Sequence, residues 1–104
     1  MESTEFEIME LITTAGESKA KAFEALKMVK SRKFDEAREL IAEARKIDVQ
    51  AHRIQTGLIT RDIDEEQESP AMGLLMVHAQ DHYMTSQLAK DLIETLIEVL
   101  DDRK

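Results

Sequence analysis

The stretch LAKDLIETLIEVL, residues 88–100, decides the fold, because its apolar residues recur every three or four positions, as they do on one face of an α-helix. This apolar face extends over more than half of the helix circumference. A thin bundle of three helices cannot cover so broad a face. We therefore expect a long helix that contacts the rest of its own chain and also other copies of the chain.

The same periodicity predicts an all-α, antiparallel, up-down-up three-helix bundle, one domain over residues 1–104, with helices at about residues 4–30, 34–62 and 70–102. Thr4 with Glu7 has the spacing of a capping box at the first helix start. Ser69 followed by Pro70 is a start signal for the third helix, since proline lacks the N–H that would be unpaired there.

Composition limits the classes of function, partner and compartment that fit this chain. The net charge of −8 argues against a nucleic-acid partner. The chain has no cysteine, which excludes disulfides and thiol nucleophiles and suits a reducing compartment. No uncharged run approaches the roughly 20 residues of a membrane span, and the acidic start does not resemble a signal peptide. We expect a cytoplasmic protein with no direct membrane insertion.

The stretch HAQDH, residues 78–82, places ionisable groups where the third helix should be apolar. His78, Asp81, His82 and Thr85 fall near the centre of its apolar stripe, which we interpret as facing the core. Burying such groups without partners is costly. An exception of this kind often marks a functional site.

The other two helices carry their own exceptions at the same height. Aligning the helices about their two turns places three pairs opposite each other, within about one helical turn: Gly16 with Val49, His52 with His82, and Gln55 with Ala79. Gly16 is either a glycine tolerated inside a helix or a point of close approach by another element.

The residues alone leave three interpretations open. His78, Asp81 and His82 could hold a structural zinc ion, although Ala79 stands where a zinc protease needs a glutamate base. A neutral imidazole at His78 could instead accept a phosphoryl group, with His82 one turn away donating to its oxygens. Both histidines could also be buried residues with satisfied hydrogen bonds.

Residues 74–85, LLMVHAQDHYMT, closely resemble the signature of the lactose/cellobiose-type enzyme IIA of the bacterial phosphoenolpyruvate-dependent sugar phosphotransferase system. Residues 51–59, AHRIQTGLI, are similar to a second motif of that family, and Gly16 with residues 22–26 resembles its first-helix pattern. The chain departs from the family at Tyr83, where leucine is usual, at residues 17–20, ESKA, and at Arg32-Lys33, in place of a Gly-Asp turn.

This resemblance implies a homotrimer and a phosphotransferase component with a phosphohistidine intermediate, not a stand-alone enzyme. His78 would accept a phosphoryl group from HPr and pass it to a cysteine of enzyme IIB, for uptake of a β-glucoside or a disaccharide such as cellobiose or lactose. Gln80 and His82 match positions beside the active histidine that would support the phosphoryl group. Asp81 matches the residue whose three copies bind one Mg²⁺ on the trimer axis.

The competing hypothesis is a helical oligomerisation module with a structural histidine or metal site and no chemistry. Uptake of phosphate would separate the two hypotheses. The sequence does not name the sugar, because the resemblance implies a component that never holds it.

Overall fold

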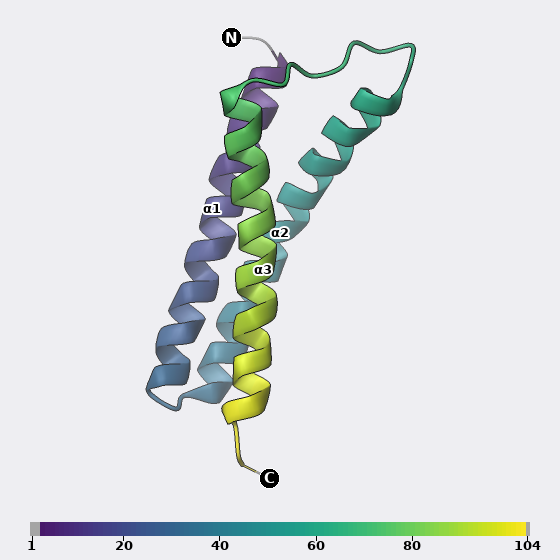
Figure 1. Ribbon diagram of the computed structural model, residues 1–104. Helices are drawn as coiled ribbons and strands as arrows, with labels where there is room; N and C mark the ends of the chain where they lie inside the picture. The colour runs from purple at the N-terminus through teal and green to yellow at the C-terminus, as the bar shows by residue number, and fades with distance from the viewer. Residues whose placement is uncertain (1–2, 104) are drawn as a thin grey trace.

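A computed structural model describes residues 3–103 and shows three long helices (Figure 1). The helices are α1, Ser3–Lys30, α2, Phe34–Ile63, and α3, Leu74–Leu100. They run up, down and up, and no strand occurs among the described residues. The all-α fold is therefore confirmed. The molecule is a rod with principal dimensions of 55 × 22 × 18 Å, and none of the described helices is both long and apolar enough to cross a membrane.

Small side chains bring α1 and α2 close together. Ala37, Ala44 and Ala51 recur every seven residues on α2 and are completely buried, as are Ala22 and Ala25 on α1. A seven-residue repeat keeps the same face of a helix turned toward its neighbour. The C-terminal half of α2 tilts away from α3 (Figure 1). The bundle is therefore tight at the end near the α1–α2 turn and more open at the other end.

The α1–α2 turn ends α1 without a glycine. Arg32 adopts the left-handed region, with φ of 59°, and the N–H groups of Arg32 and Lys33 donate to the carbonyls of Val29 and Met28 at 2.9 and 2.8 Å. These are the two hydrogen bonds of a Schellman motif, in which glycine usually takes the left-handed position. The Arg32 guanidinium lies 5.2 Å from the centroid of the Phe34 ring, and this contact helps to offset the backbone strain.

The first helix begins within one residue of its predicted start, but the capping box predicted there is absent, and the predicted start of the third helix was wrong. Thr4 lies inside α1, where its hydroxyl accepts a hydrogen bond from Arg61 at 3.3 Å, and Glu7 forms an ion pair with Arg61 rather than a capping box. The Ser69 hydroxyl donates to the Asp62 carbonyl at 3.4 Å. The chain stays irregular from Pro70 until α3 begins at Leu74, because residues 64–73 must cross from the tilted end of α2 to α3 (Figure 1).

A buried polar layer separates two apolar clusters of the core. Lys90 is completely buried, and its ammonium donates to the hydroxyls of Ser18 at 2.9 Å and Ser86 at 3.0 Å. It also lies 3.2 Å from the Asp48 carboxylate, while the Ser18 hydroxyl donates to the Ala44 carbonyl at 2.7 Å. Burial lowers the pKa of Lys90, and Asp48 opposes that shift. One ammonium group therefore contacts all three helices.

The predicted levels of α2 and α3 are confirmed to within a turn. His52 Nδ1 lies 3.1 Å from the Tyr83 hydroxyl, and the Gln55 and Gln80 amides exchange hydrogen bonds of 2.6 and 2.8 Å. Apart from the chain neighbours of Gly16 and the nearby backbone of α1, no heavy atom of the described residues comes within 4 Å of a Cβ placed on Gly16. Within the single chain, Gly16 is therefore a tolerated glycine and not a point of close approach.

We predict that Lys90→Met lowers the free energy of unfolding by about 2–3 kcal/mol, because it leaves Asp48 and two buried hydroxyls without the ammonium. Urea denaturation at neutral pH measures the change. Lys27→Met, on the exposed face of α1, is the matched control and should change stability by less than about 0.5 kcal/mol. Equal stability of Lys90→Met and wild type would contradict the tie between helices.

Candidate functional site

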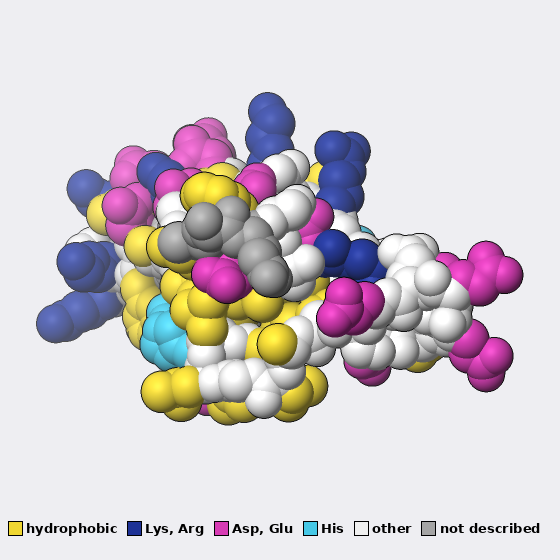
Figure 2. Space-filling model, turned by 90° about the horizontal axis from the view of Figure 1, so that it is seen from above, with side chains coloured by type: hydrophobic (Ala, Val, Ile, Leu, Met, Phe, Trp, Pro, Cys, Tyr) yellow, Lys and Arg dark blue, Asp and Glu magenta, His cyan; other side chains and the backbone are white. Residues whose placement is uncertain are grey.

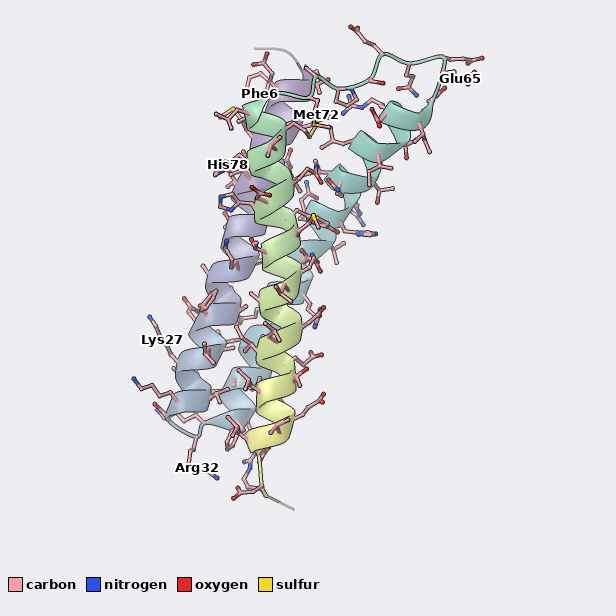
Figure 3. The ribbon with its side chains drawn as sticks, in the orientation of Figure 1. Phe6, Lys27, Arg32, Glu65, Met72 and His78 are labelled. Atoms are coloured by element: carbon pink, nitrogen blue, oxygen red, sulfur yellow. The ribbon has the colours of Figure 1, made fainter. Side chains whose placement is uncertain are left out.

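The two histidines of α3 form a contact pair. His78 and His82 are one helical turn apart, so their side chains share a face of the helix. Their ring centroids are 4.5 Å apart and the ring planes meet at 81°, an edge-to-face arrangement. His78 is exposed and His82 is half-buried. His78 projects from α3 on the side away from the tilted end of α2 (Figure 3), where another molecule can reach its ring.

The sequence pattern predicted that His78 lies on the core-facing side of α3. This prediction was wrong, because another side of α3 faces the core. The residues of α3 that are buried in the chain are Met76, Ala79, Ser86, Lys90, Ile93 and Ile97. The small residues Ala79 and Ser86 let their side of α3 pack closely against the rest of the chain. The side with His78, Asp81 and Thr85 is therefore exposed. The histidines thus lie at the edge of the buried surface.

Exposed apolar side chains continue the stripe on which Asp81 lies. Leu88 and Leu92 are 57% and 56% exposed, and Val99 is 72% exposed. Seen from above, histidine atoms border apolar atoms on one side of the molecule (Figure 2). Monomeric proteins rarely expose contiguous apolar surface of this kind. A surface of this kind is typical of a contact with another protein chain.

His82 is held neutral near pH 7. Burial lowers the pKa of His82, the charges of Lys19 and His78 lower it further, and the nearby Asp81 carboxylate only partly opposes them. Its Nδ1 atom is buried and has no hydrogen-bond partner among residues 3–103. A neutral imidazole keeps one N–H donor and one acceptor nitrogen, so His82 can still donate one hydrogen bond toward a group on His78.

Lys19 of α1 is a site residue that the sequence reasoning did not identify. Its ammonium donates to the Thr85 hydroxyl at 3.4 Å. That hydroxyl in turn donates to the Asp81 carbonyl at 2.6 Å. The sequence shows Lys19 only as one of several lysines of the first helix. Its position beside Thr85 depends on the register between α1 and α3, which the sequence does not show.

The Gln80 side chain points toward α2. Its amide pairs with Gln55 and donates to the Met76 sulfur at 3.6 Å. Gln80 and His78 are about 200° apart around the helix at roughly 100° per residue. The structure therefore does not bring Gln80 together with the histidine pair, and its contacts fix the position of α3 against α2.

The Asp81 side chain is exposed, and its carboxylate has no hydrogen bond or ion pair within the described part of the chain. No three His, Cys, Asp or Glu side chains gather there in a way that could hold a metal ion. The structural zinc site considered for His78, Asp81 and His82 is thus not supported in the single chain. A carboxylate without partners beside an open apolar surface is free to bind a hard cation.

Comparison with known proteins gives the family. Residues 7–101 match the protein-family model of the lactose/cellobiose-specific IIA subunit of the phosphotransferase system. The lactose-specific EIIA component of Staphylococcus epidermidis is 39% identical over 90 residues, which cover 86% of this chain and 85% of the relative.

Solved structures agree. The cellobiose-specific enzyme IIA of Bacillus anthracis superposes with a TM-score of 0.88 at 32% identity, covering 96% of this chain and 90% of that one. A chain from the IIA(Chitobiose)–HPr complex of Escherichia coli gives a TM-score of 0.78 at 38% identity, covering 97% and 96%. The protein therefore belongs to the lactose/cellobiose-specific IIA family, whose members are components of sugar phosphotransferase systems.

We predict that NMR titration will find the pKa of His82 below its ordinary value of 6.5. The unfolded chain then binds more protons than the folded one as the pH falls. The stabilisation from neutral His82 is therefore complete above pH 6.5 and is lost as the pH falls through the lower pKa of the folded chain. His82→Gln should remove this part of the pH dependence of unfolding, and a pKa above 6.5 would contradict the burial of the ring.

Proposed function

We propose that this protein is a phosphocarrier that accepts a phosphoryl group from HPr on His78 and passes it to a cysteine of an enzyme IIB. The exposed His78 ring in edge-to-face contact with the neutral His82 carries this proposal. Membership of the IIA family supports it, as does the structural likeness to a IIA chain solved in complex with HPr.

The chemistry needs one free ring nitrogen. The lone pair of a His78 nitrogen attacks phosphorus while the bond from phosphorus to HPr breaks and its electron pair leaves with the donor. In the second transfer a thiolate of enzyme IIB attacks, and the N–P bond breaks with its electrons returning to the imidazole. His82, neutral and in contact with the His78 ring, donates its N–H to a phosphoryl oxygen. Gln80 acts indirectly by holding α3 on α2.

The transported sugar belongs to the class of disaccharides or β-glucosides. The relatives support this class, since they carry the names of lactose, cellobiose and N,N'-diacetylchitobiose systems. We place the protein in the cytoplasm together with its two protein partners. This chain does not choose among these sugars, because the resemblance implies a component that never holds the sugar.

We predict that, when the protein is incubated with HPr, its upstream enzyme and phosphoenolpyruvate, the mass rises by one phosphoryl group. The adduct should be acid-labile and alkali-stable, as phosphohistidine is. His78→Gln should abolish uptake, whereas the matched change His82→Gln should slow it. Uptake by His78→Gln with none by His82→Gln would reverse the assignment, and no uptake by the wild type would favour the oligomerisation module.

We further propose that the protein is a homotrimer in which copies of α3 meet through the exposed Leu88, Leu92 and Val99. Asp81 lies on the same stripe, so three carboxylates would converge at the axis. Like charges in a desolvated contact repel, and one Mg²⁺ per trimer relieves this repulsion because it prefers carboxylate and water oxygens. The ion's role is to neutralise charge in the interface, and the His78 nitrogen stays free for phosphate.

We predict that light scattering will report three chains per particle and that a strong chelator will lower the melting temperature of the trimer. Asp81→Leu should leave the trimer intact and make its melting insensitive to the chelator. Glu65→Leu, in the exposed loop after α2, is the control and should keep the dependence. A folded monomer at micromolar concentration, or dissociation of Asp81→Leu, would count against this assembly.

A further inference from the structure

We propose that Lys19 of α1 binds the phosphoryl group carried by His78, so that the phosphoryl site spans two helices. This inference rests on the proposed function, in which His78 is phosphorylated. It adds a cation from α1 to a site that otherwise consists of α3 residues.

The geometry of Lys19 leaves its ammonium able to take a second partner. The hydrogen bond to Thr85 is long, at 3.4 Å, and exposed, and the Thr85 hydroxyl already donates its proton to the Asp81 carbonyl. An ammonium group has three N–H donors. Two of them have no hydrogen-bond partner within residues 3–103. Little is lost when this group exchanges Thr85 for a phosphoryl oxygen.

The direction of the side chain favours such an exchange. Side chains on a helix lean toward its N-terminus, and α1 and α3 run the same way, with their N-termini at the same end (Figure 1). The Lys19 stem therefore leans toward the end of α3 that carries the histidines. Gly16, one turn before Lys19 on α1, adds no side chain, and apart from its chain neighbours and the nearby backbone of α1, no heavy atom of residues 3–103 lies within 4 Å of its Cβ position. The stem has room to move in that direction.

The charge of the site calls for a cation. A phosphoryl group carries a charge of about −1.5 to −2 near neutral pH, and it would be placed one turn from Asp81 on a chain with a net charge of −8. His82 is neutral and offers a hydrogen bond without a charge. Charge-assisted hydrogen bonds to phosphate are roughly twice as strong as neutral ones. Lys19 already acts electrostatically on His82, so its charge reaches the pair.

Two roles for Lys19 lead to different outcomes. If Lys19 binds the phosphoryl group itself, it stabilises the phosphorylated form whatever the donor is. If it only contacts HPr, its loss affects transfer from HPr and not from a small molecule. Phosphoramidate, which transfers its phosphoryl group to imidazole with release of ammonia, is therefore the second donor to use.

The experiment compares wild type, Lys19→Gln, Lys19→Arg and the control Lys27→Gln, with the native assembly of each checked first by light scattering and thermal melting. Lys27 is two turns further along α1 and lies well away from His78 (Figure 3). Lys19→Gln should lower the equilibrium ratio of phosphorylated to free protein by about tenfold with either donor. Lys19→Arg should stay within about twofold of wild type, and Lys27→Gln should match it.

A second readout follows the phosphoryl group directly. In ³¹P NMR titrations the second pKa of the phosphoryl group should be higher in Lys19→Gln than in wild type, because a nearby cation favours the dianion. A change of fold alone would not move this value while the phosphohistidine signal persists. Lys19→Arg should restore the wild-type pKa.

Three results would overturn the inference: wild-type ratios in Lys19→Gln with both donors, a loss confined to HPr, and an equal loss in Lys27→Gln. The first removes any role, the second assigns Lys19 to docking, and the third assigns the effect to net charge. Failure of the proposed function looks different, because the wild type would then take no phosphate from either donor, and the inference would fail with it.

Discussion

The buried ammonium of Lys90 sets the register of the whole bundle. A charge placed in the interior must have partners, and here the partners come from all three helices: Ser18 on α1, Asp48 on α2 and Ser86 on α3. Sliding α2 against α3 by one turn would take the Asp48 carboxylate away from the ammonium, at a cost of about 3–5 kcal/mol, and sliding α1 would take away the Ser18 hydroxyl. Apolar contacts between alanines and leucines tolerate such a shift much better. The register in turn brings Lys19 beside Thr85 and so determines what surrounds the histidine pair.

The site depends on two faces of α3, only one of which is buried within the chain. One face, with Ala79 and Ser86, packs against its own chain, and the other, with Leu88 and Leu92, is left open. His82 lies at the boundary between them, which lowers its pKa through burial while its neighbour His78 stays accessible. Accessibility of one ring and neutrality of the other are thus consequences of a single geometric arrangement.

Periodicity was sufficient to predict the helices and their order, because long amphipathic patterns depend on local spacing. The start signal at Ser69 and Pro70 failed, since the outward tilt of α2 is a tertiary feature that forces the connection to stay irregular. Periodicity also could not reveal Lys90 or Lys19, because a lysine in a sequence does not show which helix lies opposite. The residue of most functional interest, His78, stood out as a polar exception in the apolar stripe, the family motif favoured its role as phosphoryl acceptor, and its contact with His82 follows from helical spacing.

The outward tilt of α2 makes the two ends of the rod unequal in their resistance to local opening. The end near the α1–α2 turn is closed by a continuous apolar cluster and by ion pairs that join Arg32 to Asp102 and Arg38 to Asp101. At the other end α2 faces α3 across a groove lined by Leu58, Met72 and other side chains. Regions with fewer buried contacts open at lower free energy. Backbone fluctuations should therefore begin beside the loop of residues 64–73 and become smaller toward the polar layer around Lys90. The part of the bundle between that layer and the α1–α2 turn should stay rigid and hold α3 in place.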